Sequence, residues 1–158
     1  MSSSFQAVIA ARVLTNLRLP AVAAAAGVAA GTWADTAATR VFRGLSGFLA
    51  GRNRGRLPFV EFDIETQQFN QDTIEGGTAT STVHLIAHCG GRDPAVASEL
   101  LAAILSAGFA AIRLETTDNY TALGDDQIGA TMQGPFGHQR DGTLTISHSF
   151  ARSDYGVA

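Results

Sequence analysis

The sequence predicts an α+β domain with a mostly antiparallel sheet of four to five strands, an N-terminal helix and one central capped helix packed on the sheet. Two observations lead to this fold class. Apolar residues recur at helical spacing before residue 50 and at every second residue from Phe59 onward. Between two of the predicted strands, residues 83–108 carry an alternating pattern that runs through Gly90 and Gly91 into a segment with helix signals at both ends. A helix among consecutive strands is typical of α+β domains.

Length and composition indicate one self-contained domain. The chain has 158 residues, 46% of them hydrophobic, which is enough to bury a core. No internal repeat or domain boundary is visible, so we expect residues 1–158 to form a single domain. Charged residues make up 16% of the chain, below the usual quarter, and a weakly charged surface favours contacts with other protein chains.

Several classes of protein are disfavoured by the same sequence. A single cysteine, Cys89, excludes an internal disulfide and a zinc site with several thiolates. The most membrane-like stretch, residues 19–34, is interrupted by Pro20, Gly27 and Gly31 and is shorter than the roughly 20 apolar residues that a span requires. We expect no membrane span and no targeting segment.

The N-terminal third predicts two helices and a basic loop. Ser4 is a suitable N-cap for a helix of about residues 5–17, whose apolar stripe is Phe5, Val8, Ile9, Val13 and Leu17. Residues 19–56 form an Ala/Gly/Arg-rich insertion or extended segment within the domain. Inside it, a second helix is predicted by the helical spacing of Val41, Phe42, Leu45, Phe48 and Leu49. The run GRNRGRLP then predicts a basic loop.

The remaining elements follow from alternation and from helix end signals. From Phe59 the apolar face is Val60, Phe62 and Ile64, and the opposite face is Glu61, Asp63 and Glu65. A second strand over residues 78–89 completes a hairpin around Gly76 and Gly77. Asp93 suits an N-cap, Pro94 the first helical position, and Gly108 the position after a helix C-terminus. Further strands are predicted around residues 112–116, 128–132 and 144–150.

Histidine and cysteine residues supply the only candidates for catalysis or metal binding. His84 and His88 share a strand face, but four strand residues span about 13 Å, too far for both to bind one ion. His88, Cys89 and His148 could be assigned as nucleophile and base in a small enzyme, although only their residue types support this. No standard nucleotide, hydrolase or metalloprotease motif is present. We therefore expect no enzyme, no cofactor and no metal.

The row of carboxylates Glu61, Asp63 and Glu65 has two interpretations. In a monomer it is a solvated strand face. If several copies of this strand lined the hole of a ring, the carboxylates would repel DNA phosphates and let DNA pass without binding. Arg52, Arg54 and Arg56 would then pair with a neighbouring subunit or partner, and otherwise form a solvated loop.

Three segments resemble the tail terminator, or tail-completion, proteins of long-tailed bacteriophages: LPFVEF at 57–62, STVHLIAHCGGRDPAVASELLAAILSAG at 81–108 and GTLTISHSFA at 142–151. Members of that family start with an amphipathic helix and enter their sheet at a Leu-Pro-aromatic step. They then run a strand into a capped helix and close with a strand near the C-terminus. Residues 19–56 depart from the family, because they are longer than its usual link between the first helix and the sheet.

The resemblance implies a structural virion protein of the tail or neck, assembled in the host cytoplasm. It would form a homo-oligomeric ring, usually a hexamer, that ends tail-tube polymerisation and joins the tail to the head connector. Its partners would be the tail-tube protein and the head–tail connector, with DNA passing through the ring. Another connector or head-completion protein, or a tail-tube subunit, is the alternative.

Overall fold

The computed structural model describes residues 2–35, 40–44, 57–73, 76–91, 93–114 and 120–151. Along the chain, its elements are α1 (Ser2–Leu17), α2 (Pro20–Ala26), α3 (Ala30–Trp33), β1 (Val41–Arg43), β2 (Phe59–Thr73), β3 (Gly76–Cys89), α5 (Pro94–Leu114), β4 (Tyr120–Ile128), β5 (Met132–Gly134) and β6 (Gly137–Ala151). The strands form one six-stranded sheet in the order β1-β2-β3-β6-β4, with β5 paired to β6. Every pairing is antiparallel except β1 with β2, so the predicted fold class is confirmed.

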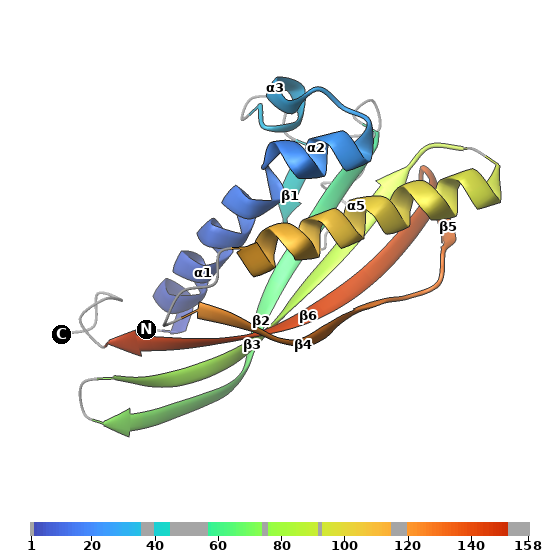
Figure 1. Ribbon diagram of the computed structural model, residues 1–158. Helices are drawn as coiled ribbons and strands as arrows, with labels where there is room; N and C mark the ends of the chain where they lie inside the picture. The colour runs from blue at the N-terminus through green and yellow to red at the C-terminus, as the bar shows by residue number, and fades with distance from the viewer. Residues whose placement is uncertain are drawn as a thin grey trace.

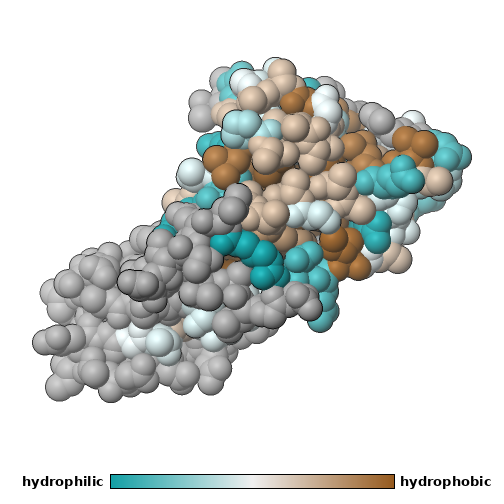
Figure 2. All heavy atoms as spheres, in the orientation of Figure 1, coloured by the Kyte–Doolittle hydropathy of each residue, from teal (hydrophilic) through white to brown (hydrophobic). Residues whose placement is uncertain are grey.

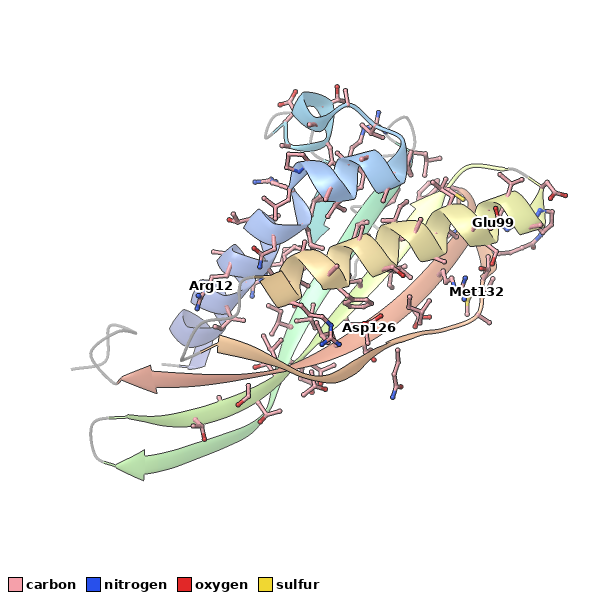
Figure 3. All side chains as sticks on the ribbon, in the orientation of Figure 1. Arg12, Glu99, Asp126 and Met132 are labelled. Atoms are coloured by element: carbon pink, nitrogen blue, oxygen red, sulfur yellow. The ribbon has the colours of Figure 1, made fainter. Side chains whose placement is uncertain are left out.

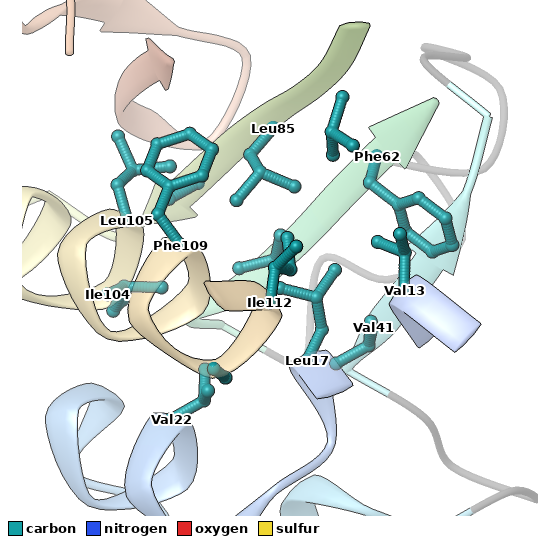
Figure 4. Close-up of a cluster of buried hydrophobic side chains, with 14 of the residues drawn as sticks. Val13, Leu17, Val22, Val41, Phe62, Leu85, Ile104, Leu105, Phe109 and Ile112 are labelled. Carbon is teal, nitrogen blue, oxygen red and sulfur yellow. The ribbon is translucent and has the colours of Figure 1, made fainter. Parts of the chain in front are cut away.

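The described helices all lie on one side of the sheet (Figure 1). The core fills the space between the two layers, where side chains from α1, α5 and the strands meet (Figure 4). On β2, Val60, Phe62 and Ile64 are buried on this side, as the alternation predicts. They lie opposite Ala87, Leu85 and Val83 of β3, which are also buried.

Helix α5 begins where the sequence predicts and ends later. Pro94 is its first residue, and the carbonyl of Asp93 accepts the first helical hydrogen bond, from Ala97 N at 2.9 Å. The expected end at Gly108 is wrong, because the helix continues to Leu114. Phe109 and Ile112 are fully buried, so the added turns extend the apolar face of the helix.

The last turn of α5 is also tied to the edge of the sheet by a polar contact. Arg113 Nη2 donates to Asp126 Oδ1 on β4 at 3.4 Å. Figure 3 shows Asp126 on β4, below the C-terminal part of the helix. Both side chains are about one-third exposed, so the pair adds little stability and mainly orients the two elements.

Gly108 was predicted to follow the C-terminus of the helix, but it lies within α5 and allows close packing there. A Cβ atom at this position would lie 3.0 Å from Leu17 Cδ2 on α1 and 3.3 Å from Leu85 Cδ1 on β3. The missing side chain therefore lets α5 approach both α1 and the sheet. Close approach of two backbones is a recognised use of glycine, and it competes with the helix-ending signal that glycine also carries.

Three further predictions differ from the structure. Residues 112–114 belong to α5, so the strand predicted over 112–116 is wrong there, and residues 115–116 lie outside the described residues. The strand predicted over 128–132 is split, since Ile128 ends β4, Met132 begins β5 and Ala130 lies between them. The last predicted strand is present in β6, which begins earlier, at Gly137.

The helix predicted over residues 41–49 is also wrong within the described residues. Residues 41–43 form β1, parallel to β2, and residues 45–50 lie outside the described residues. Val41 is buried on the helix side, whereas Phe42 packs against Phe59 on the opposite side. In the extended conformation the two side chains reach apolar surroundings on opposite faces of the sheet, and this tertiary packing overrides the helical spacing.

The first part of the 19–56 segment is integrated into the domain. Gly27 adopts a left-handed conformation with φ of 70° and ends α2, its N–H bonding to the carbonyls of Ala23 and Ala24. Trp33 of α3 is fully buried, and its Nε1 donates to the Leu17 carbonyl at 2.7 Å. The segment therefore folds back onto the end of α1.

By length and composition, α5 is apolar enough to cross a membrane. Its apolarity has a second explanation in the fold, because one face of the helix packs on β3, β4 and β6. Helix α5 also packs on α1 and α2, and its buried apolar residues are Ala97, Leu101, Ile104, Leu105, Phe109, Ala111 and Ile112.

The surface on the helix side of the domain contains many apolar residues. Figure 2 shows apolar residues over much of α2 and α5, with polar residues between them. Among the described residues, the large hydrophobic side chains that reach solvent are Leu19, Val96 and Met132. They come from different elements, and single exposed hydrophobic residues are ordinary on protein surfaces.

We predict that Gly108→Met destabilises the domain by about 3 kcal/mol, because the new side chain overpacks the contact between α5, α1 and β3. Methionine has a higher helix propensity than glycine, so helix propensity alone would make the variant more stable. Urea unfolding of both forms measures the difference. Ala110→Met, on the exposed side of the same helix, is the matched control and should change stability by at most about 0.5 kcal/mol. Equal effects of the two changes would contradict this role of Gly108.

Candidate functional site on the second face of the sheet

The candidate site lies on the face of the sheet turned away from the described helices, which we call the second face. Residues that pair across neighbouring strands lie on the same face, so the strand registers show which residues belong to the second face. From β2, β3 and β6 it comprises Phe59, Glu61, Asp63 and Glu65; Thr82, His84, Ile86 and His88; and Gln139, Asp141, Thr143 and Thr145. These side chains are largely polar, in contrast with the apolar helix side.

One part of the second face is acidic and open to solvent. Glu65 is exposed, and Asp63 lies directly opposite His84 in the β2–β3 register. The side chains of His84 and Asp141 are 36% and 44% exposed, and His84 Nε2 lies 3.4 Å from Asp141 Oδ2. Three carboxylates thus share this part of the face with one imidazole, and it is negatively charged at neutral pH. The ion pair itself contributes little to stability, because both partners are well solvated.

Sequence reasoning missed Asp141. Alternation along residues 144–150 predicted a closing strand, but that strand begins at Gly137 and Asp141 lies within the added part. Its place beside His84 follows from the β3–β6 register, in which Asp141 pairs with Ile86 and Thr143 with His84. His84 and Asp141 are 57 positions apart in the chain, and local sequence patterns do not predict contacts over such a separation.

The other part of the second face is buried around a contact between a carboxyl group and an imidazole. Glu61 and His88 are 4% and 3% exposed, and His88 Nε2 lies 3.0 Å from Glu61 Oε2. The Phe59 ring stacks on the His88 ring with centroids 4.6 Å apart and an angle of 19°. We call Phe42, Phe59, Glu61, His88 and Phe136 the buried cluster.

Two further phenylalanines complete the buried cluster. Phe42 of β1 meets Phe59 edge-on at 5.7 Å, and Phe136, in the turn between β5 and β6, lies 5.9 Å from Phe59 and 6.2 Å from His88. That turn packs closely on the end of β3. At Gly137, where φ is 142°, a Cβ atom would lie 2.5 Å from the carbonyl carbon of Gly90. Only glycine allows this approach, which brings Phe136 to the histidine.

The predicted acidic stripe is therefore interrupted. Glu61, Asp63 and Glu65 do lie on one face of β2, but Glu61 is buried and paired with His88, whereas Asp63 and Glu65 face solvent to different degrees. The physical reason is that Glu61 lies within reach of a buried histidine on β3, whose ring stacks on Phe59. Glu65 keeps an exposed position, and Asp141 joins the acidic part instead.

The structure separates the residues considered for catalysis. Cys89 belongs to the core on the helix side, whereas His88 belongs to the buried cluster on the second face. Neighbouring strand residues point to opposite faces, so these two cannot act together as nucleophile and base. The His148 side chain lies outside the described residues, as do Arg52, Arg54 and Arg56.

Metal binding receives no support from the geometry of the described residues. His84 and His88 each face a different carboxylate, Asp141 and Glu61 respectively. Within the part of the chain that the structure describes, no group of three or more His, Cys, Asp or Glu side chains could hold an ion. The second face is thus a polar, acidic surface next to a buried cluster.

No protein-family model matches this chain, and no curated protein matches it. The order of its elements and the chemistry of the second face remain as guides to its function.

We predict that Glu61→Ala lowers the free energy of unfolding by about 3 kcal/mol, because it leaves His88 buried without its partner. Glu61→Gln should cost less, since the amide oxygen can still accept a hydrogen bond from Nε2. Denaturant unfolding at neutral pH measures both. The control is Glu65→Ala, on the same strand and face but exposed, with an expected change within about 0.5 kcal/mol. If Glu61→Ala proved as mild as this control, the pair would have no part in stability.

Proposed function

We propose that this protein is a structural virion component of a long-tailed phage. In this proposal it forms a ring at the head-proximal end of the tail, ends polymerisation of the tail tube and joins the tail to the head connector. The observation that carries the proposal is the acidic, solvent-open part of the second face, on which no described helix lies. Such a face suits the wall of a channel through which DNA passes.

Electrostatics favour this use of the acidic face. Asp63, Glu65 and Asp141 offer carboxylates toward solvent. Among the second-face residues of β2, β3 and β6 named above, the basic side chains are His84 and His88, and His88 is buried. A protein that grips DNA uses lysine and arginine to neutralise phosphates, whereas carboxylates repel them. Repeated around a ring, the acidic face would keep DNA centred and mobile.

The order of elements also supports the proposal. Helix α1 precedes the Leu57-Pro58-Phe59 step into β2, β3 leads directly into α5, and β6 closes the sheet near the C-terminus. This is the order on which the resemblance to tail terminators rests. The long segment 19–56 adds α2, α3 and β1 to the same domain, since α2 packs on α5 and β1 pairs with β2.

The structure bears differently on the competing functions. A small enzyme that uses His88 and Cys89 is disfavoured, because the two side chains lie on opposite faces of the sheet. A head-completion protein or a tail-tube subunit would share the acidic face and the element order. Those alternatives are decided by the phenotype of particles that lack the protein.

We expect the purified chain to form a closed oligomer of several times its 16.5 kDa mass. Native mass spectrometry and sedimentation velocity at micromolar concentration measure this directly. Because the ring would bury protein surface of low charge, the oligomer should persist at high salt. A chain that stays monomeric under all these conditions would contradict self-assembly in the absence of the tail.

We expect phage particles made without this protein to carry tails of abnormal, excessive length. The physical reason is that nothing then caps the growing end of the tube. Electron microscopy of lysates from a deletion phage, complemented by the wild-type gene as control, gives the answer. Absent tubes would identify a tube subunit instead, and empty heads beside normal tails would identify a closure protein.

A further inference from the structure

Among the described residues, no strand covers the outer side of most of β2 or of β4, the two edges of the sheet. At one edge, β1 pairs with only residues 60–62 of β2, and no described segment pairs with the rest of that side of β2. At the other edge, β4 pairs with β6 and with no other described strand. Along an unpaired edge, backbone N–H and C=O groups in alternate residues lack partners and can accept another strand.

The two edges are compatible in direction. β2 is antiparallel to β3, β3 to β6, and β6 to β4. It follows that β2 and β4 run in opposite directions within one subunit. When a second copy is placed beside the first in the same orientation, its β4 therefore meets β2 as an antiparallel neighbour, the pairing with well-aligned hydrogen bonds.

The two edges also lie at the same level of the sheet. Thr121 of β4 pairs with Ser147 of β6, Ser147 with Thr80 of β3, and Thr80 with Gln68 of β2. Thr121 and Gln68 thus share a row of the sheet. A second copy can be brought alongside without a large slide along the strands.

From these observations we propose that copies of this chain join edge to edge, with the β4 edge of one subunit pairing antiparallel to the β2 edge of the next. The segments that meet are residues 120–123 of β4 and residues 65–70 of β2. This inference rests on the proposed ring and specifies its interface. Two different edges meet in each contact, so the arrangement is heterologous, and it forms a ring when the rotation between successive subunits closes.

Charge favours this contact over pairing of β2 with itself. Residues 63–72 of β2 contain Asp63, Glu65 and Asp72 and no basic residue. Two copies of β2 placed antiparallel would bring acidic segments together, and like charges on directly opposed strands are destabilising. Residues 120–123 of β4 are Tyr, Thr, Ala and Leu, which carry no charge.

Irregularities in both edges define the length of the contact. Asp63 Oδ1 accepts the N–H of Ile64 at 2.8 Å, which occupies one edge group at the start of the open stretch. The register shifts between Thr66 and Gln68 in β2 and between Leu123 and Gln127 in β4. Such bulges bend a strand and stop long flat pairing. A short contact that bends at each subunit suits a closed ring better than an open fibre.

The test is disulfide trapping with engineered cysteines. The native Cys89 is buried, so a double variant Gln68→Cys with Thr121→Cys presents two new thiols at the sheet edges. Under mild oxidation it should form a ladder of covalent oligomers up to the ring, because residues facing each other on antiparallel strands have the short Cα separation that a disulfide needs. A second double variant, Asn70→Cys with Thr121→Cys, tests a contact that is shifted by two residues along β2.

Controls make each outcome decisive. Thr121→Cys combined with Ala24→Cys, on the exposed side of α2, should give no ladder. If Gln68→Cys alone gives covalent dimers, β2 pairs with itself and the inference is wrong. If native mass spectrometry shows the ring but neither β2 cysteine forms a ladder with Thr121→Cys, the ring stands and this interface fails. If no oligomer forms before oxidation and none is trapped, both the proposed ring and its interface are contradicted.

Discussion

The contact between α5 and the sheet is the constraint on which the rest of the structure depends. A 21-residue helix lies on β3, β4 and β6, and its buried face supplies Leu101, Leu105, Phe109 and Ile112 to the core. Close contact is possible because two glycines, Gly108 on the helix and Gly142 on β6, carry no side chain where the layers meet. At Gly142 a Cβ atom would lie 2.8 Å from the Phe109 ring. Burying these side chains is the main favourable term in folding, and it commits one face of the sheet to the core.

Because one face of the sheet packs against the helices, the second face is available for other uses. It consists of a buried part and a solvent-exposed part. Near the end of β3, aromatic rings from β1, β2 and the β5–β6 turn enclose Glu61 and His88. Their atoms Glu61 Oε1 and His88 Nδ1 have no hydrogen-bond partner among the described residues. Polar groups that are removed from water without full hydrogen bonding cost free energy, so this pair is a weak source of net stability. Its position is instead well suited to holding the short strand β1 and the β5–β6 turn in register with the sheet.

Farther along the strands the second face carries solvent-exposed carboxylates, and no described strand pairs with the outer side of most of β2 or of β4. A monomer with such edges is exposed to uncontrolled pairing, which proteins commonly prevent by bulges, charge or coverage. Here bulges and acidic residues are present on the same strands whose edges are open. These features are compatible with pairing that is restricted to one partner and one register. The proposed assembly of subunits edge to edge depends on these features of the two strands.

Local patterns determined much of this fold from the sequence alone: the fold class, the start of α5 at Pro94, the hairpin of β2 and β3, and the buried face of Val60, Phe62 and Ile64. These features depend on periodicity and end signals that operate over a few residues. Tertiary structure decided what local signals leave ambiguous. Gly108 carries a terminator signal and also permits close packing, and only the positions of Leu17 and Leu85 select the second role. Glu61 belongs by alternation to a solvated row, and only the neighbouring His88 and the phenylalanine rings remove it from water, because burial depends on contacts between strands that are distant in the chain.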